Sequence, residues 1–182
     1  MRRRKSTEDF FQRLRKIHRE LGIPDEYIDA PRLPLCVEPG LLIDTEPDYY
    51  QRPQKLVPAA HEAWLAMRGA ARRDGVELLL ISAFRGIDYQ RDLIRRHLEA
   101  GRQLDDILRV IAAPGFSEHH TGRALDLASS ECIDLEERFE KTIAFQWLER
   151  ESCEFGFTLS YPRHNPFGIA YEPWHWCFHD QD

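Results

Sequence analysis

The stretch Ser117-Glu118-His119-His120-Thr121-Gly122-Arg123-Ala124-Leu125-Asp126 carries two residue types that bind divalent metals, histidine and aspartate. His119 and Asp126 are too far apart in the sequence to share one helical face, so we expect His119 on a turn and Asp126 on the strand that follows. Gly122 allows the turn, because glycine adopts backbone angles that other residues avoid. Alternation along the strand then places Ala124 and Asp126 on one face. The stretch therefore predicts a turn and a strand that present an imidazole and a carboxylate.

A second segment near the C-terminus, Glu172-Pro173-Trp174-His175-Trp176, adds another imidazole and another carboxylate. In a regular strand Glu172 and His175 would point to opposite faces, but Pro173 lacks an N–H for the ladder, so we expect a bend that turns both toward one site. Three protein ligands leave a tetrahedral zinc one position for water, and a neighbouring carboxylate such as Glu172 can take the proton of that water. We therefore predict a catalytic Zn2+ site with three protein ligands: His119, Asp126 and His175.

The pattern Ser-x-His-x-x-Gly-x-Ala-x-Asp, followed by Glu-x-x-His, resembles the zinc D-alanyl-D-alanine carboxypeptidases of peptidoglycan metabolism. That family shares its fold with D-Ala-D-Ala dipeptidases and with the Hedgehog signalling domain, and the resemblance covers residues 78–178. It implies the three zinc ligands named above and Glu172 as general base and acid. It also implies that Arg85 grips the terminal carboxylate of the substrate and that Ser117 helps to bind the substrate near the cleaved bond.

By this resemblance the partner is a peptidoglycan stem peptide or a soluble muropeptide, from which one C-terminal residue is released. A D,D-carboxypeptidase is the expected activity, while L,D-carboxypeptidase, D,D-dipeptidase or phage-type endopeptidase activity stays open within the same fold. An alternative of another class is a zinc-containing binding module without turnover. Glu172 speaks against that alternative, because a site that only binds needs no base.

Arg85 follows the apolar run 76–82, which is typical of a buried central strand. Loops at strand ends commonly carry function, and a guanidinium can hold a carboxylate through two parallel hydrogen bonds. The alternative is a surface arginine paired with Asp88 or with another acid. The sequence alone leaves both open, and the resemblance favours substrate binding.

Composition bounds the possible partners and compartments. With 182 residues, 42% of them hydrophobic, the chain can bury one good core in a single compact domain. A net charge of −6 and a single short basic run at 2–5 argue against nucleic acid as a partner. No apolar region follows that run and no window approaches about 18 apolar residues, so we expect neither a signal peptide nor a membrane segment. A cytoplasmic location is expected; a periplasmic one or export by another route stays open, as does the oligomeric state.

Cysteines 36, 132, 153 and 177 are widely spaced and are expected to be reduced thiols. Cys177 lies two residues after His175, so it could close the metal site as a fourth ligand; the alternative is a small buried hydrophobe. Nickel, cobalt or copper could bind the same ligands in place of zinc.

An α+β fold is expected, with an antiparallel sheet and flanking helices, because long helices come first and most strands later. We divide the chain into an N-terminal helix and wrapping segment, 1–53, and a zinc carboxypeptidase core, 54–182. The proline-rich part of the first segment, 23–53, should cover the core or form one wall of the substrate cleft. Periodicity and breaker residues predict helices at 7–21, 57–73, 88–100, 104–111 and 136–153.

Several single side chains carry expectations of their own. We expect His18 on the surface and Leu65 facing inward. Ile143 should contribute apolar bulk to the helix 136–153. We expect His120 to point away from the metal. Glu118 is expected to be either a solvated carboxylate or one that orients His119 or His120 through the second ring nitrogen.

Overall fold

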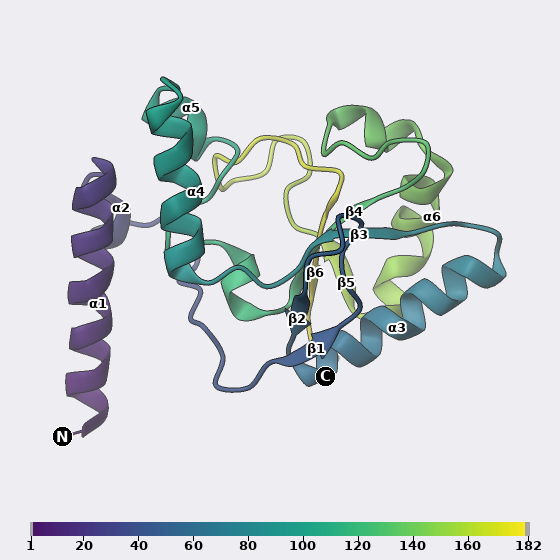
Figure 1. Cartoon of the computed structure of the whole chain (residues 1–182), viewed down its shortest axis with the longest axis horizontal. Coiled ribbons are helices and arrows are strands. Elements are labelled where there is room, and N and C mark those ends of the chain that lie inside the picture. The colour runs from purple at the N-terminus through teal and green to yellow at the C-terminus, as the bar shows by residue number, and fades with distance from the viewer. Residues whose placement is uncertain (1, 181–182) are drawn as a thin grey trace.

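A four-stranded antiparallel sheet lies at the centre of the computed structural model, which describes residues 2–180 (Figure 1). The strand order is β3-β4-β6-β5. The strands are β3 (Leu79–Ser82), β4 (Ala124–Ala128), β5 (Phe157–Leu159) and β6 (His175–Phe178). Two further short strands, β1 (Ile43–Thr45) and β2 (Gln54–Leu56), pair with each other in a separate two-stranded sheet. The fold is the α+β architecture expected from the sequence.

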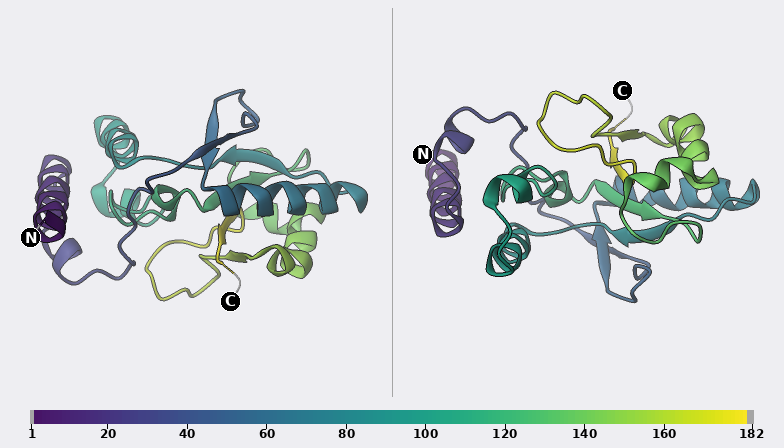
Figure 2. Two further views of the ribbon diagram at one scale, coloured as in Figure 1. Left: turned by 90° about the horizontal axis from the view of Figure 1, so that it is seen from below. Right: turned by 90° about the horizontal axis from the view of Figure 1, so that it is seen from above.

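Helices flank the sheet on several sides (Figures 1 and 2). The α-helices are α1 (Arg2–Leu21), α2 (Glu26–Asp29), α3 (Pro58–Arg73), α4 (Ile87–Glu99), α5 (Leu104–Leu108) and α6 (Ile143–Glu151). Three short 3-10 turns complete the set: η1 (Glu118–Thr121), η2 (Glu137–Lys141) and η3 (Ser152–Phe155). Over residues 2–180, no helix combines the length and the apolar character that crossing a lipid bilayer demands.

The single helix predicted over 136–153 is wrong, because Thr142 interrupts it. Thr142 has an extended backbone, and its side chain accepts a hydrogen bond from the amide of Phe145 at 3.1 Å, which starts α6 as a new helix. Ile143, expected to add apolar bulk, is 61% exposed in the first turn of that helix.

One face of the sheet packs against α3 and α6 to form the main hydrophobic core. Leu125 and Leu127 of β4 point into it and meet Trp64 and Met67 of α3. The inward stripe of α3 runs through positions 60, 64, 67 and 71, so Leu65 lies one residue off the stripe and is exposed. The expectation that Leu65 faces inward is therefore wrong. Asp126 lies between the two leucines and thus points to the opposite face of the sheet.

A second core joins α1 to α4 and α5, on the side of the molecule away from α3 (Figure 1). Leu14, Ile17 and Leu21 give α1 its apolar stripe, and His18 lies within that stripe at helical spacing. His18 is fully buried, and its Nε2 is 2.8 Å from the carbonyl oxygen of Pro114. The predicted surface position of His18 is therefore wrong.

Ile23, Ile28 and Leu33 belong to the second core, so the first part of the segment 23–53 covers that core, as one of the two expectations for the segment proposed. Its buried side chains are Ile23, Ile28, Leu33, Cys36 and Asp48. Cys36 also donates its amide to the carbonyl of Gly115, 2.8 Å away, two residues before the site segment begins at Ser117. The chain therefore passes from α1 to β1 along the region that carries the first metal-ligand candidate. The division of the chain at residue 53 stays a prediction.

Gly122 ends η1 with a φ of +67°, and only Arg123 separates it from β4. A Cβ at this position would meet Leu42 Cδ2 at 2.6 Å and the amide nitrogen of Val57 at 3.3 Å. We therefore expect Gly122→Ala to lower the free energy of unfolding by about 1–3 kcal/mol, through backbone strain and this crowding. Chemical denaturation measures the change.

The matched control is Gly40→Ala, because a Cβ on Gly40 meets no heavy atom within 4 Å and its φ is not positive. Equal stability of the two variants would contradict the role given to Gly122.

Candidate metal centre

His119, Asp126 and His175 converge on the sheet face opposite the main core. Nε2 of His119 lies 3.2 Å from Oδ1 of Asp126, and Nδ1 of His175 lies 3.1 Å from the same oxygen. One ligand atom from each residue can be chosen such that all three lie within 4.8 Å of one another. All three side chains are buried. Two imidazole nitrogens and one carboxylate oxygen are donors that suit zinc, so the residues present fit a zinc ion.

Strand pairing and the turn before β4 bring these side chains together. In the pairing of β4 with β6, Asp126 is directly opposite His175. His119 lies in η1, and Gly122 then turns the chain into β4, as the sequence predicted. Nδ1 of His119 lies 2.5 Å from the carbonyl oxygen of Ala83 and can donate to it, which leaves Nε2 to face Asp126.

Glu118 orients His175 rather than His119 or His120, so the prediction of its partner is wrong. Oε2 of Glu118 lies 2.8 Å from Nε2 of His175, 57 residues away in the sequence. Burial alone would lower the pKa of His175, but hydrogen bonds to Asp126 and Glu118 outweigh it and raise that pKa to about 10. Burial opposes ionisation of Glu118 too, yet His175 lowers its pKa to about 2. The pair therefore fixes the ring of His175 with Nδ1 toward Asp126.

Arg85 reaches into the same cluster. Its Nη1 donates to Oδ2 of Asp126 at 3.0 Å and to Oγ of Ser82 at 3.2 Å. The alternative partner Asp88 instead pairs with two arginines of the helical region, Arg13 and Arg91. Arg85 thus pairs with an acid, as the alternative proposed. That acid is the candidate metal ligand Asp126, so the pair lies at the site and not on the surface.

Glu172 lies at the bend expected before His175. The amide of His175 donates to the carbonyl of Glu172 at 3.1 Å, and a Glu172 carboxylate oxygen lies 4.0 Å from Nδ1 of His175. Burial raises the pKa of Glu172 to about 8. A divalent cation beside it would act in the opposite direction and favour the carboxylate.

A narrow cavity of about 20 Å³ connects these groups, and Ser117 lies on its wall. Its polar lining consists of Arg85, Ser117, His119, Tyr161, Glu172 and His175. Tyr161 was missed from the sequence: its ring centroid lies 4.8 Å from that of His175, and burial raises the pKa of its phenol, which therefore stays protonated. The sequence signal that could have pointed to Tyr161 is its position as an aromatic residue at the start of the loop that leads to Glu172 and His175.

The rival ligands lie outside the cluster. Nδ1 of His120 is 2.5 Å from the carbonyl oxygen of Arg85, and burial lowers the pKa of His120 to about 4. Cys177 is a buried thiol whose pKa is raised by burial, and it does not belong to the group of converging ligand atoms. His164 and His179, which lie near the second segment in the sequence but do not fit the ligand pattern, are exposed.

Comparison with known proteins adds a family. Residues 53–181 match the VanY family, described as D-alanyl-D-alanine carboxypeptidase. The inferred carboxypeptidase YodJ of Bacillus subtilis (strain 168) is 32% identical over 152 residues, a region that makes up 79% of this chain and 55% of YodJ. The chain thus spans about half the length of that relative.

Two solved structures have a similar fold. The LdcB LD-carboxypeptidase has a TM-score of 0.69 at 30% identity, over 78% of this chain and 69% of that chain. The D,D-pentapeptidase VanY from a VanB-type resistance cassette, solved in complex with Zn(II), has a TM-score of 0.60 at 21% identity, over 81% of this chain and 87% of that chain. The expected zinc-peptidase fold is therefore confirmed.

The contact between Glu118 and His175 predicts that Glu118→Gln binds zinc about 10–100-fold more weakly, because an amide orients the imidazole less firmly and does not enhance its basicity. Competition with a chromophoric chelator measures the affinity without reference to activity. Glu62→Gln, at an exposed position of α3, is the matched control. Equal zinc affinity of the Glu118 variant and the unchanged protein would rule out this role.

Proposed function

Because the chain belongs to the D-alanyl-D-alanine carboxypeptidase family that its residues 53–181 match, we propose that it is a zinc-dependent carboxypeptidase. It would hydrolyse the C-terminal D-Ala-D-Ala peptide bond of peptidoglycan stem peptides. The observation that carries the proposal is the convergence of His119, Asp126 and His175, because the two histidines of this group line one cavity with Glu172. Two imidazoles and one carboxylate make a three-ligand site, and Glu172 is a carboxylate beside it that can move a proton.

Zinc, when bound by those three ligands, supplies an activated water molecule and polarises the carbonyl of the cleaved bond. Glu172 is the proposed general base and acid. It would take the proton of the attacking water and return it to the nitrogen of the departing residue. Its burial, and its distance of 4.0 Å from His175, suit a group that holds a proton between these two steps.

Arg85 is the proposed anchor for the free carboxylate at the end of the substrate. Its Nη1 is engaged by Asp126 and Ser82, but its Nε is buried without a hydrogen-bond partner among residues 2–180. The guanidinium therefore keeps donor capacity for a carboxylate. Ser117 is buried on the wall of the same cavity, where its side chain would contact the substrate near the cleaved bond.

A second candidate activity is L,D-carboxypeptidase. The likeness to LdcB, at 30% identity and a TM-score of 0.69, favours it over dipeptidase or endopeptidase activity. A panel of peptides that end in L- or D-residues, with mass spectrometry of the products, distinguishes these specificities. It also tests the non-catalytic binding module, which would release no product from any peptide.

We infer a cytoplasmic location and soluble muropeptide fragments as the natural substrate. The support is that Cys36, Cys132 and Cys177 are free thiols, which is the usual state in a reducing compartment. Recovery of the protein outside the cytoplasmic fraction of its cells would contradict this location.

The base role of Glu172 predicts that Glu172→Gln binds one equivalent of zinc but loses hydrolysis of a D-Ala-D-Ala-terminated peptide by several orders of magnitude. The amide keeps the shape of the side chain and cannot accept the proton of water. Product release by mass spectrometry and zinc content are measured on the same samples. Glu149→Gln, at an exposed position of α6, is the control, and activity of the Glu172 variant near that of the control would exclude the mechanism.

For Arg85→Ala we expect a rise in KM for peptides with a free C-terminus, because the variant lacks the donors for that carboxylate. The ratio of kcat/KM for a free-acid peptide to that for its C-terminal amide is the direct measure. The unchanged protein should strongly prefer the free acid and the variant should not. If the unchanged protein cleaves both equally well, the role of Arg85 is wrong.

A further inference from the structure

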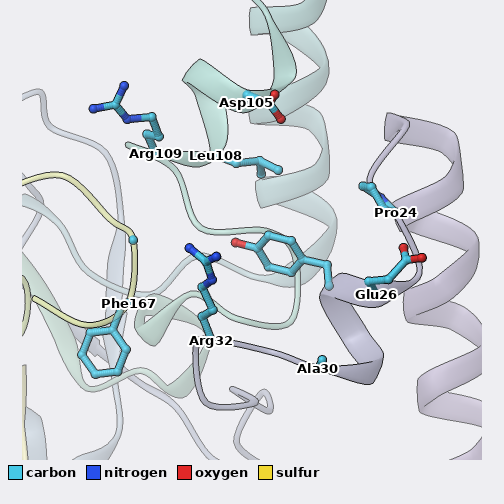
Figure 3. Close-up of a pocket in the computed structure, with 10 residues that line it drawn as sticks. Pro24, Glu26, Ala30, Arg32, Asp105, Leu108, Arg109 and Phe167 are labelled. Carbon is cyan, nitrogen blue, oxygen red and sulfur yellow. The ribbon is translucent and has the colours of Figure 1, made fainter.

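A larger cavity, of about 430 Å³, lies between the N-terminal segment and the core (Figure 3). Tyr27 and Arg32 line it from the region of α2, Arg109 from the chain after α5, and Phe167 and Gly168 from the loop before the second site segment. We call it the N-terminal cavity. Pro24 to Arg32 lie outside the part of the chain, 53–181, that matches the family model.

The N-terminal cavity is next to the narrow cavity at the metal centre, which we call the catalytic cavity. Two segments of chain line both cavities with consecutive residues. Arg109 lines the former and Val110 the latter; Gly168 lines the former and Ile169 the latter. The amide of Ala170 donates to the carbonyl of Arg109 at 2.7 Å and holds the two segments together. Consecutive Cα atoms are about 3.8 Å apart, so a peptide of a few residues is long enough to extend from one cavity to the other.

The position of Arg85 gives the direction of such a peptide. Arg85 lines the catalytic cavity and also a third cavity of about 300 Å³, which shares no lining residue with the N-terminal cavity. A substrate whose C-terminal carboxylate is held at Arg85 therefore has its remaining residues free to extend toward Arg109. These residues lie on the N-terminal side of the cleaved bond.

Charge identifies the group that the N-terminal cavity would take. In the view of Figure 3, Arg32 and Arg109 lie on the side of Phe167, and Glu26 lies on the opposite side. Neither arginine forms an ion pair within the described part of the chain, 2–180, although both line the cavity. Two guanidinium groups suit one carboxylate, whereas the acids on the wall, Glu26 and Asp105, disfavour a phosphorylated ligand of higher charge.

We propose that Arg32 and Arg109 bind a carboxylate that the substrate carries on the N-terminal side of the cleaved bond. The inference rests on the proposed carboxypeptidase function and adds a preference for acidic peptides to it. It also gives the N-terminal segment a role in recognition, because Arg32 lies on that segment. The guanidinium of Arg32 lies close to the loop before the second site segment: a Cβ on Gly168 would be 3.5 Å from its Nη1.

The test uses the zinc-loaded full chain and N-acetylated pentapeptides that end in D-Ala-D-Ala. A single glutamate is placed at position one, two or three, with alanine at the other two, and each peptide has a glutamine twin. We expect kcat/KM for at least one glutamate peptide to exceed that for its twin about tenfold. Arg32→Gln and Arg109→Gln should each remove most of this preference, by lowering kcat/KM for the glutamate peptide more than for its glutamine twin.

Arg72→Gln is the matched control, since it removes the same charge at an exposed position on α3 that lines none of these cavities. Arg32 and Arg109 are also exposed, and thermal melting checks that the variants fold. Equal kcat/KM for every glutamate peptide and its twin in the unchanged protein overturns the inference, as does a preference that survives both substitutions.

A binding arm separates this inference from the proposed function. Dissociation constants of the same peptides are measured by calorimetry with zinc-loaded Glu172→Gln, alone and combined with each arginine substitution. If the unchanged protein cleaves no peptide, the carboxypeptidase proposal fails, while these constants still decide whether the arginines recognise the carboxylate. If peptides are cleaved but glutamate and glutamine twins bind equally, only the inference fails.

Discussion

The antiparallel pairing of β4 with β6 is the contact on which the rest of the structure depends, because it places Asp126 directly opposite His175. The two segments are 49 residues apart in the sequence, so no local pattern could align them. A shift of one residue would turn Asp126 into the hydrophobic core and send Leu125 or Leu127 to the site. The packing of those leucines against α3 therefore holds the register and, with it, the metal centre.

Asp126 is a buried carboxylate shared by three other groups: His119, His175 and Arg85. A buried charge is tolerated only when it is paired and hydrogen-bonded. Each of the two histidine partners here makes a further contact through its other ring nitrogen. Ala83 accepts from His119, and Glu118 contacts His175. The site is therefore organised by contacts beyond the candidate metal ligands.

The N-terminal third of the chain is joined to the metal centre by the second hydrophobic core. α1 packs on α4 and α5 through a stripe that includes buried His18 (Figure 1). Cys36, in the segment 23–53, then donates its amide to the carbonyl of Gly115, shortly before η1. Through this packing Arg32 and Arg109 line the same cavity, and Gly168 on its wall is followed in the chain by Ile169, which lines the narrow cavity at the metal centre. The arrangement connects a region outside the family match to the path proposed for the substrate.

Features encoded over a few neighbouring residues were predictable from the sequence. The turn at Gly122, the strand bearing Asp126 and the bend at Pro173 follow from backbone preferences and side-chain alternation, which act over short distances. The three candidate metal ligands were named from two short segments, and the structure brings them together. The α+β class followed from the order of helices and strands.

Only the tertiary structure decided which partners these residues have. Glu118 contacts His175 across 57 residues, and Arg85 contacts Asp126 across 41, because strand register and chain path bring them together. The burial of His18 depends on Pro114, in a loop 96 residues away. Tyr161 lies at the site because its ring packs beside that of His175 in β6. Periodicity reports which face of an element is apolar, but the neighbour that covers a polar group is set by how the whole chain packs.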